Sequence, residues 1–184
     1  AVRPITHVTI VNRSRARAEQ LMYTLQTNHP HCTVTIADDR ATALAQADVV
    51  CLATSASTPV FADHEIRAGT HINGIGSYTH TMVEADPHTV ARAYVAVDQF
   101  AAAWSEAGEL IAARDQGLLD PAHVVQIGDI ANGTVPGRQN TAQITFFKSV
   151  GNAAQDVAVA SIAYTAATQH QRDRKSTRLN SSHA

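Results

Sequence analysis

Short apolar segments alternate with helical segments along most of this chain, and this alternation limits the possible folds more than any other feature. Five segments are short, apolar and contain β-branched residues, as buried strands do: residues 7–11, 32–37, 48–54, 71–76 and 93–98. Repeated β-α-β units of this length predict an α/β fold: a Rossmann-type, doubly wound, mostly parallel sheet with helices on both faces. Ligands of such sheets bind at the carboxyl ends of the strands.

The segment 144–160, ITFFKSVGNAAQDVAVA, carries the most local information. A strand of β-branched and aromatic residues runs into Lys148, Ser149, Val150 and Gly151, and an alanine-rich helix follows at once. We expect Ser149 to cap that helix and the first N–H groups of the helix to form an anion site. Taken alone, Lys148 fits a solvated cation.

Composition excludes several classes of protein. The chain has 184 residues, of which 45% are hydrophobic and 16% charged, in keeping with one soluble globular domain. A net charge of −2 gives no broad field for nucleic acid or an anionic membrane, and no apolar run approaches the roughly 20 residues of a membrane helix. Cys32 and Cys51 form no C-x-x-C pair, and we expect Cys51 to be a buried free thiol in a protein of the reducing cytoplasm.

The ten histidines do not indicate a metal centre. No pair has H-x-x-x-H spacing on an expected helix, and no Cys/His cluster occurs. His29 and His31 lie in a loop and fit solvated side chains. Asp98 fits a strand-end residue, whereas Asp38 and Asp39 fit turn residues rather than an acid pair. We therefore expect no metal site.

Three strings occur in a specific order and at specific spacings: GTHINGIG at residues 69–76, AGEL at 107–110 and ITFFKSVGNAAQDVAVA at 144–160. Together they resemble the ornithine cyclodeaminase and mu-crystallin family, over nearly all of the chain from Val8 to about Tyr164. Members of that family are nicotinamide-dependent enzymes that act on imines and amino acids. The resemblance implies an enzyme of small imino or amino acids that is a homodimer when complete. Cysteine usage and net charge, as above, predict a cytoplasmic protein with no nucleic-acid or membrane partner.

A dinucleotide-binding fold begins with a strand and a G-x-G-x-x-G turn, and no such glycine cluster occurs before residues 7–11. In the family, that strand, its turn and a substrate-binding and dimerisation half precede the segment that this chain resembles. We therefore expect an amino-terminally truncated fragment. It would comprise a Rossmann domain over residues 1–148 that lacks its first strand, and a helix over 149–172 that packs on the missing half. Residues 173–184 are polar, resemble translated adapter sequence, and are expected to be a disordered, non-native tail.

The first visible strand ends at VNRS, where the adenosine ribose of a dinucleotide would lie. An acidic residue at that point suits NAD, whereas an arginine accommodates the extra phosphate of NADP. The chain offers Asn12, Arg13, Ser14 and, one turn on, Arg17. By themselves these residues fit a helix N-cap followed by solvated arginines. Similar N-R-T/S segments in mu-crystallin-like members imply that all four bind the cofactor, with NADP(H) preferred and NAD(H) as the alternative.

The resemblance implies further cofactor-binding residues at the ends of other strands: Thr54, Ser55, His71, Ile72, Asn73 and Ser149. Judged by itself, the segment after residue 53 is better explained as an ordinary strand-to-loop turn. Gly74 and Gly76 would leave space for the nicotinamide ring. Val150 would border the substrate, although simple helix packing also explains it.

Tyr78 stands where true ornithine cyclodeaminases carry an aspartate that is proposed to handle water or amine during deamination. The segment from Ser77 to His80 contains no carboxylate, and Glu84 lies too far along the chain to be assumed to replace it. Sequences with a similar G-S-Y-T segment resemble ketimine or pyrroline-carboxylate reductases. We therefore expect Tyr78 to be the catalytic residue and imine reduction to replace cyclodeamination.

The expected activity is NAD(P)H-dependent reduction of a cyclic imino acid, such as a pyrroline- or piperideine-carboxylate, by hydride transfer to the imine carbon. Ornithine cyclodeamination is the second alternative and alanine dehydrogenase activity the third. A different class stays open, since the chain could be a mu-crystallin-like protein that binds a small ligand or serves structurally. We expect the fragment alone to be inactive, because the family's substrate-binding lysine and arginines would lie outside it.

Overall fold

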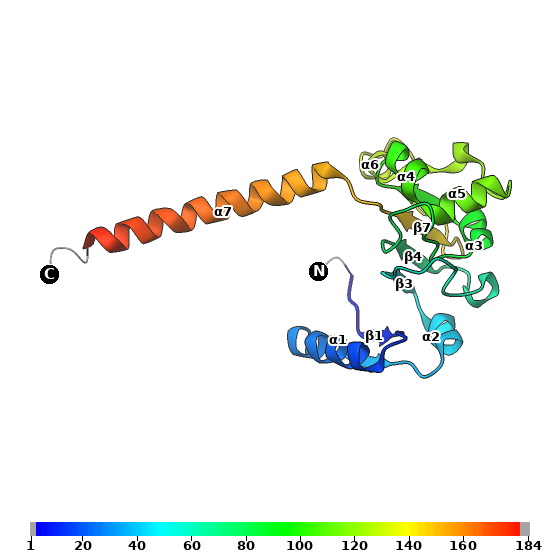
Figure 1. The fold of residues 1–184 in the computed structure, drawn as a ribbon, viewed down its shortest axis with the longest axis horizontal. Helices are drawn as coiled ribbons and strands as arrows, with labels where there is room; N and C mark the ends of the chain where they lie inside the picture. Colours follow the sequence, from blue (N-terminus) through cyan, green and yellow to red (C-terminus); the bar gives the residue numbers. More distant parts are fainter. Residues whose placement is uncertain (1–2, 181–184) are drawn as a thin grey trace.

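Seven parallel strands, arranged in two sheets, form the framework of the part of the chain that the structure describes (Figure 1). The computed structural model describes the backbone of residues 3–180 and the side chains of residues 3–169. One sheet pairs β1 (His7–Ile10) with β2 (Thr33–Ile36). The other has the order β3 (Val49–Leu52), β4 (His71–Gly74), β7 (Thr145–Lys148), β5 (Tyr94–Val97) and β6 (Val125–Gln126). This topology confirms the predicted α/β fold with a parallel sheet.

Helices and short 3-10 turns occupy the connections between the strands. The helices are α1 (Arg15–Asn28), α2 (Arg40–Gln46), α3 (Pro87–Arg92), α4 (Phe100–Glu106), α5 (Gly108–Asp115), α6 (Ile127–Ala131) and α7 (Ala153–Asn180), and the 3-10 turns are Asp63–Glu65 and Pro121–His123. Polar side chains cap several helices, because the first N–H groups of a helix have no partner within it. The predicted cap of α1 is confirmed, since the Ser14 hydroxyl accepts a hydrogen bond from the Arg17 N–H at 3.4 Å.

The main hydrophobic core lies between one face of the five-stranded sheet and helices α3, α4 and α5. Side chains alternate between the two faces of a strand, and those on the core face, among them Ile72 and Phe146, are fully buried. The two-stranded sheet and α1 share a much smaller core built on Ile10, Ala18 and Val34. The larger sheet therefore supplies most of the buried apolar surface.

The other face of the larger sheet is open at β3. Val49 is 43% exposed, and Cys51 is exposed as well. The expectation that Cys51 is buried was therefore wrong, because β3 is the edge strand of its sheet and Cys51 points away from the core. Both cysteines are free thiols, as predicted for Cys51.

Helix α7 projects from the body of the molecule (Figure 1). Its apolar side chains Val157 and Tyr164 are exposed. The backbone is helical through Asn180, and the expectation that residues 173–184 are a disordered, non-native tail stays a prediction. Residues 168–180 contain neither glycine nor proline and are rich in good helix formers, which explains the continuation. The expectation for residues 181–184 lies outside the described residues.

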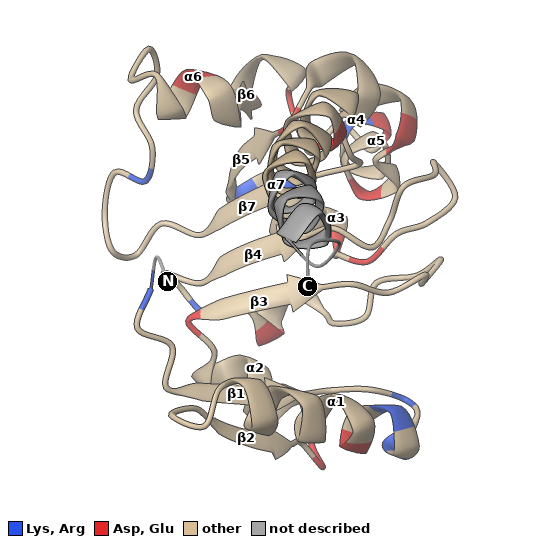
Figure 2. Cartoon of the chain, turned by 90° about the vertical axis from the view of Figure 1, so that its left-hand side faces the viewer, with Lys and Arg blue, Asp and Glu red and all other residues tan. Residues whose placement is uncertain are grey.

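Strands β1 and β3 each have an unpaired edge. Within the described residues the two sheets share no strand pairing, and both of these strands pair on one side only. Figure 2 shows the two-stranded sheet set apart from the larger one, with β1 on the side nearer to β3. An unpaired strand edge presents N–H and C=O groups that can pair with another chain. Association through these edges is therefore the main hazard of this fold.

We expect the 184-residue chain to aggregate or to behave as a molten globule, because the edges of β1 and β3 are unpaired and the outer face of β3 is exposed. Val49→Lys should raise the soluble monomer fraction, since a charge on an exposed edge strand opposes edge-to-edge pairing. Size-exclusion chromatography with light scattering measures that fraction.

Val159→Lys is the matched control, because Val159 is 65% exposed on α7 and lies on no strand edge. An equal gain in soluble monomer from Val159→Lys would show that the exposed helix drives association. A cooperative thermal melt of a monomeric wild-type chain would contradict the expectation altogether.

Candidate functional site

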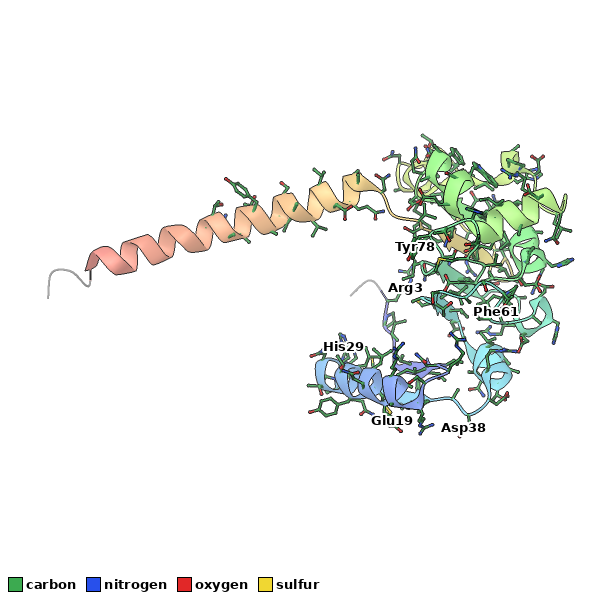
Figure 3. All side chains as sticks on the ribbon, in the orientation of Figure 1. Arg3, Glu19, His29, Asp38, Phe61 and Tyr78 are labelled. Atoms are coloured by element: carbon green, nitrogen blue, oxygen red, sulfur yellow. The ribbon has the colours of Figure 1, made fainter. Side chains whose placement is uncertain are left out.

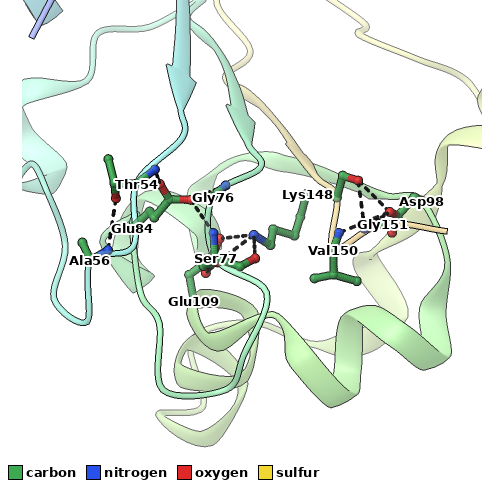
Figure 4. A network of polar contacts seen from close by, with 11 residues as sticks. Thr54, Ala56, Gly76, Ser77, Glu84, Asp98, Glu109, Lys148, Val150 and Gly151 are labelled. Carbon is green, nitrogen blue, oxygen red and sulfur yellow. Dashed lines mark hydrogen bonds and ion pairs between the residues drawn. The ribbon is translucent and has the colours of Figure 1, made fainter. Parts of the chain in front are cut away.

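Polar loops meet at the carboxyl ends of four neighbouring strands of the larger sheet (Figure 4). They follow β3, β4, β5 and β7 directly. Three fully buried charged side chains support them: Glu84, Glu109 and Lys148. Because parallel sheets bind ligands at this edge, these loops form the candidate site.

Glu84 joins the end of β3 to the end of β4. Its Oε1 accepts a hydrogen bond from the Thr54 N–H at 2.5 Å, and its Oε2 accepts from the N–H groups of Gly76 and Ser77, both at 2.8 Å. Charge-assisted hydrogen bonds of this kind are strong. The carboxylate is engaged by three backbone donors and is not free to act as a base, in keeping with the expectation that Glu84 does not replace the cyclodeaminase aspartate.

Lys148 is not the solvated cation that its sequence context suggested. It is fully buried, because it follows Phe146 by two residues in β7 and points to the same core-facing side. The Lys148 Nζ lies 3.1 Å from Glu109 Oε1 and donates to the Ser77 carbonyl at 2.6 Å and to the Ser77 hydroxyl at 2.7 Å. The hydroxyl in turn donates to Glu109 Oε2 at 2.6 Å. A buried ion pair between Lys148 and Glu109 therefore links two of the strings that carry the family resemblance, those at residues 144–160 and 107–110.

Asp98 binds the segment between β7 and α7, next to the place where we expected the first N–H groups of the helix to form an anion site. Its Oδ2 accepts hydrogen bonds from the Ser149 hydroxyl at 2.7 Å and from the N–H groups of Val150 and Gly151 at 3.2 and 3.1 Å. Helix α7 begins only at Ala153, so the expectation that Ser149 caps it was wrong. The physical reason is the backbone of Gly151, whose φ of +95° lies outside the right-handed helical region.

Gly74 and Gly76 pack against the protein itself. A Cβ at Gly76 would lie 2.3 Å from the backbone N and O atoms of Thr54, and a Cβ at Gly74 would lie 2.9 Å from the ring of Phe146. Both positions therefore require glycine for close packing at the strand ends. The expectation that these glycines leave space for a nicotinamide ring stays a prediction.

Strand β4 spreads its three predicted cofactor residues along its length. His71 begins the strand at the amino end, away from the candidate site, and Ile72 is fully buried in the core. The His71 Nδ1 lies 2.7 Å from the Thr145 hydroxyl and its Nε2 lies 3.2 Å from Asn73 Oδ1. Burial lowers the pKa of His71, and the hydrogen bond with Asn73 opposes that effect. The structure does not bring these side chains together with the loop residues.

The predicted adenosine-side residues lie at the carboxyl end of β1. The Asn12 Oδ1 accepts a hydrogen bond from the Ser14 N–H at 2.8 Å, which shapes the turn into α1. Arg13 and Arg17 are exposed, and no ion pair is found for either among the described residues. Arg15, by contrast, forms an ion pair within α1. Two unpaired cations thus flank the start of α1.

Exposed side chains occupy the outer part of the candidate site. Thr54 and Ser55 are exposed, and the Thr54 hydroxyl oxygen accepts a hydrogen bond from the Ala56 N–H at 3.2 Å. Tyr78 is 60% exposed on the larger body of the molecule rather than on the two-stranded sheet (Figure 3). Val150 is partly buried against the main core. These four residues therefore follow the carboxyl ends of β3, β4 and β7, where the buried side chains of Glu84, Glu109 and Lys148 support the loops.

Sequence reasoning missed the buried polar network of Glu84, Glu109 and Lys148. Strand alternation could have revealed Lys148, which shares the face of an aromatic residue two positions earlier. Glu109 belongs to the AGEL string, but that string does not name its partners, Ser77 and Lys148, which lie more than 30 residues away. Glu84 binds Gly76 and Ser77 nearby and Thr54 30 residues away, and no spacing in the sequence marks these main-chain contacts. Such contacts become visible only when the fold is assembled.

The histidines form no cluster suited to a metal ion in the part of the chain that the structure describes. No group of three or more His, Cys, Asp or Glu side chains there could hold a metal ion. His29 and His31 are exposed, with ring centroids 6.0 Å apart. Among the described helices, none has the length and apolar character to cross a membrane.

A parallel sheet with polar loops at its carboxyl edge defines a Rossmann-like fold. The chain belongs to the ornithine cyclodeaminase/mu-crystallin family, whose model matches residues 1–171. It is 34% identical over 173 residues to the Delta(1)-pyrroline-2-carboxylate reductase of Bacillus cereus, a match that covers 92% of this chain and 52% of the relative. The chain thus spans about half the length of the curated relatives it matches. The family resemblance is confirmed.

Solved structures give the same picture of the fold. The Thermococcus litoralis Delta(1)-pyrroline-2-carboxylate reductase, solved in complex with NADH and L-proline, matches with a TM-score of 0.89 at 29% identity over 92% of this chain and 53% of the other. An archaeal alanine dehydrogenase dimer with bound NAD matches with a TM-score of 0.84 at 27% identity, covering 92% of this chain and 52% of the other. These likenesses confirm the Rossmann-like fold.

Proposed function

We propose that this chain is the cofactor-binding part of an enzyme that reduces a cyclic imino acid, such as Δ1-pyrroline-2-carboxylate, with a reduced nicotinamide dinucleotide. A curated relative at 34% identity bears the name of that activity, and a solved neighbour holds NADH and L-proline. One observation on the chain itself carries the proposal. The candidate site presents hydroxyl groups and the phenol of Tyr78, whereas the carboxylates beneath it, Glu84 and Glu109, are buried and bonded.

The complete enzyme would contain a second part that binds the substrate. Residues 1–148 would form the dinucleotide-binding domain, and the unpaired edges of β1 and β3 support the addition of a further strand between them. Residues 149–172 would pack on the second part through the exposed apolar side chains of α7. A homodimer in the cytoplasm completes the proposal, and the alanine dehydrogenase neighbour is itself a dimer.

The start of α1 fits the adenosine end of the cofactor. Asn12, Arg13 and Ser14 offer donors and a cation but no carboxylate, and Arg17 adds a second exposed cation. The positive end of the helix dipole strengthens attraction for an anion at this point. This chemistry suits the 2′-phosphate of NADP(H), which is therefore the proposed cofactor, with NAD(H) as the alternative.

The candidate site at the carboxyl ends of β3, β4, β5 and β7 fits the nicotinamide end of the cofactor. The Ser149 hydroxyl donates to Asp98 and its oxygen accepts from the Gly151 N–H at 3.3 Å. A hydroxyl oxygen has two lone pairs, so one is left to accept a further hydrogen bond, for instance from a carboxamide. The Thr54 oxygen accepts from a backbone N–H, so its hydrogen is left to donate. Ser55 is exposed beside it. We do not extend the proposal to the His71 side chain, which lies at the far end of β4.

The chemistry divides simply between cofactor and protein. When bound, the reduced nicotinamide supplies a hydride to the imine carbon, and the residues of the chain hold the reactants in place and exclude water. Val150 would border the substrate. Tyr78 would orient the imine or a water molecule, because its hydroxyl can both donate and accept a hydrogen bond.

Cyclodeamination is not favoured by this geometry. That reaction needs a group that handles water or amine, and the aspartate of the true cyclodeaminases is replaced by Tyr78. Glu84 and Glu109 already bind buried donors, and Asp98 at the same edge binds the Ser149 hydroxyl and two backbone N–H groups. A base must reach the proton that it removes, and each of these three carboxylates is already engaged by donors of the protein.

In the complete enzyme, Arg13→Ala should weaken NADPH binding by about 10- to 100-fold, because a charged hydrogen bond to a phosphate contributes roughly 1.5–3 kcal/mol. NADH lacks the 2′-phosphate, so its dissociation constant should stay nearly unchanged. Fluorescence titration with each cofactor measures the two constants.

Arg15→Ala is the matched control for this prediction. Arg15 lies on the same helix, but its guanidinium is 3.0 Å from Glu19. Its removal should leave both dissociation constants unchanged. Equal losses of NADPH and NADH affinity in Arg13→Ala would mean that Arg13 does not meet the phosphate.

Tyr78→Phe should lower kcat for imine reduction by about 3- to 10-fold, because it removes one hydrogen bond at the reacting edge. Oxidation of NADPH in the presence of Δ1-pyrroline-2-carboxylate measures the rate. Tyr23→Phe, an exposed tyrosine on α1, should have no effect. An unchanged rate in Tyr78→Phe would show that the phenol only packs.

The reaction class has its own test. Ornithine and NAD are added to the complete enzyme, and released ammonia is compared with the rate of imine reduction. We expect imine reduction to be much faster. Ammonia release at an equal or greater rate would overturn the proposed reductase in favour of a cyclodeaminase.

A further inference from the structure

Three ionisable side chains beneath the candidate site have no part in the function proposed above. Glu84, Glu109 and Lys148 are fully buried at the carboxyl ends of β4 and β7. Removing such a charge from water costs several kcal/mol unless the protein supplies compensating bonds. Apolar side chains would fill the same space without that cost. The presence of the charges therefore requires a reason other than packing.

All three side chains converge on Ser77. Lys148 donates to its carbonyl oxygen at 2.6 Å and to its hydroxyl oxygen at 2.7 Å. Glu84 accepts the Ser77 N–H at 2.8 Å, and Glu109 accepts the Ser77 hydroxyl at 2.6 Å. Each polar group of Ser77 is thus bound by a buried charged side chain (Figure 4).

The surroundings leave this segment little room to move. The backbone of Gly76 packs so closely on Thr54 that a Cβ there would lie 2.3 Å from backbone atoms. The third contact of the Lys148 ammonium is Glu109 Oε1, at 3.1 Å. The peptide group between Ser77 and Tyr78 is therefore fixed from the inside, while the Tyr78 side chain remains exposed at the edge.

We propose that Lys148 is a positioning residue: by holding the carbonyl and hydroxyl groups of Ser77, it fixes the Ser77–Tyr78 peptide and so directs the Tyr78 side chain to the reacting edge. Glu109 balances the ammonium charge and binds the same hydroxyl. The inference rests on the proposed function, in which Tyr78 orients the imine. An aliphatic pair could fill the space but could not hold a carbonyl oxygen.

The test compares Lys148→Met, Glu109→Leu and the double variant in the complete enzyme. Each single variant leaves an uncompensated buried charge and should lower the melting temperature, whereas the double variant should recover most of that loss. The kcat of the double variant should nevertheless stay about 3- to 10-fold below wild type, the same loss as Tyr78→Phe, because both changes remove one oriented hydrogen bond. KM for the imino acid should change little.

A combined variant distinguishes positioning from a general loss of stability. Adding Tyr78→Phe to the double variant should cause no further fall in kcat, because the two changes act through one hydroxyl. The inference would be overturned if the kcat losses of Tyr78→Phe and of the double variant multiplied in the combined variant. It would also be overturned if the kcat of the double variant recovered together with its melting temperature. Arg92→Met is the control, since it breaks the 2.6 Å bond to Asp63 on another part of the fold and should lower the melting temperature without lowering kcat.

Hydrogen exchange separates this inference from the proposed function. The double variant should exchange its amide hydrogens in residues 75–79 faster than wild type, while the peptides of α1 stay unchanged. If the wild-type enzyme reduces no cyclic imino acid, the proposed function fails, and this measurement still decides whether Lys148 fixes the segment. Unaltered exchange in residues 75–79 would overturn the positioning role.

Discussion

The buried carboxylate of Glu84 is the interaction on which the candidate site depends. Its oxygens bind backbone N–H groups from the ends of two neighbouring strands, at Thr54, Gly76 and Ser77. An ionised group without such donors could not remain inside the protein, so the carboxylate and the loop backbone require each other. Because the donors are main-chain groups, this constraint fixes the loops without fixing the side chains that they display. The residue at position 78 can therefore differ among relatives on an unchanged frame.

Strand alternation adds a second constraint at the end of β7. Lys148 points into the core toward Glu109, whereas Ser149 lies beyond the strand and is bound by Asp98. Two adjacent residues are thus bound by acidic partners from different elements. A shift of one residue in the register of β7 would place the lysine away from its acid, and the buried charges oppose such a shift. The network therefore specifies register as well as position.

The parallel sheet was predictable from the sequence, because short apolar segments between helical segments leave few other arrangements. The cap of α1 was predictable as well, since a serine before an apolar helical stripe is a local signal. The cap expected at Ser149 failed, because the left-handed backbone at Gly151 delays the helix to Ala153. The ion pair of Lys148 and Glu109 was not predictable locally, since its members come from a strand and a helix far apart in the sequence.

The separation of the two sheets has a consequence for cofactor binding. Arg13 lies at the end of β1 on the smaller sheet, and Ser149 lies at the end of β7 on the larger one. A dinucleotide that meets both must span the interval between them, and no strand pairing within residues 3–180 sets that interval. A strand that pairs with both free edges would set it. Pairing of that strand and binding of the cofactor would then stabilise the same arrangement, so each must strengthen the other by mass action.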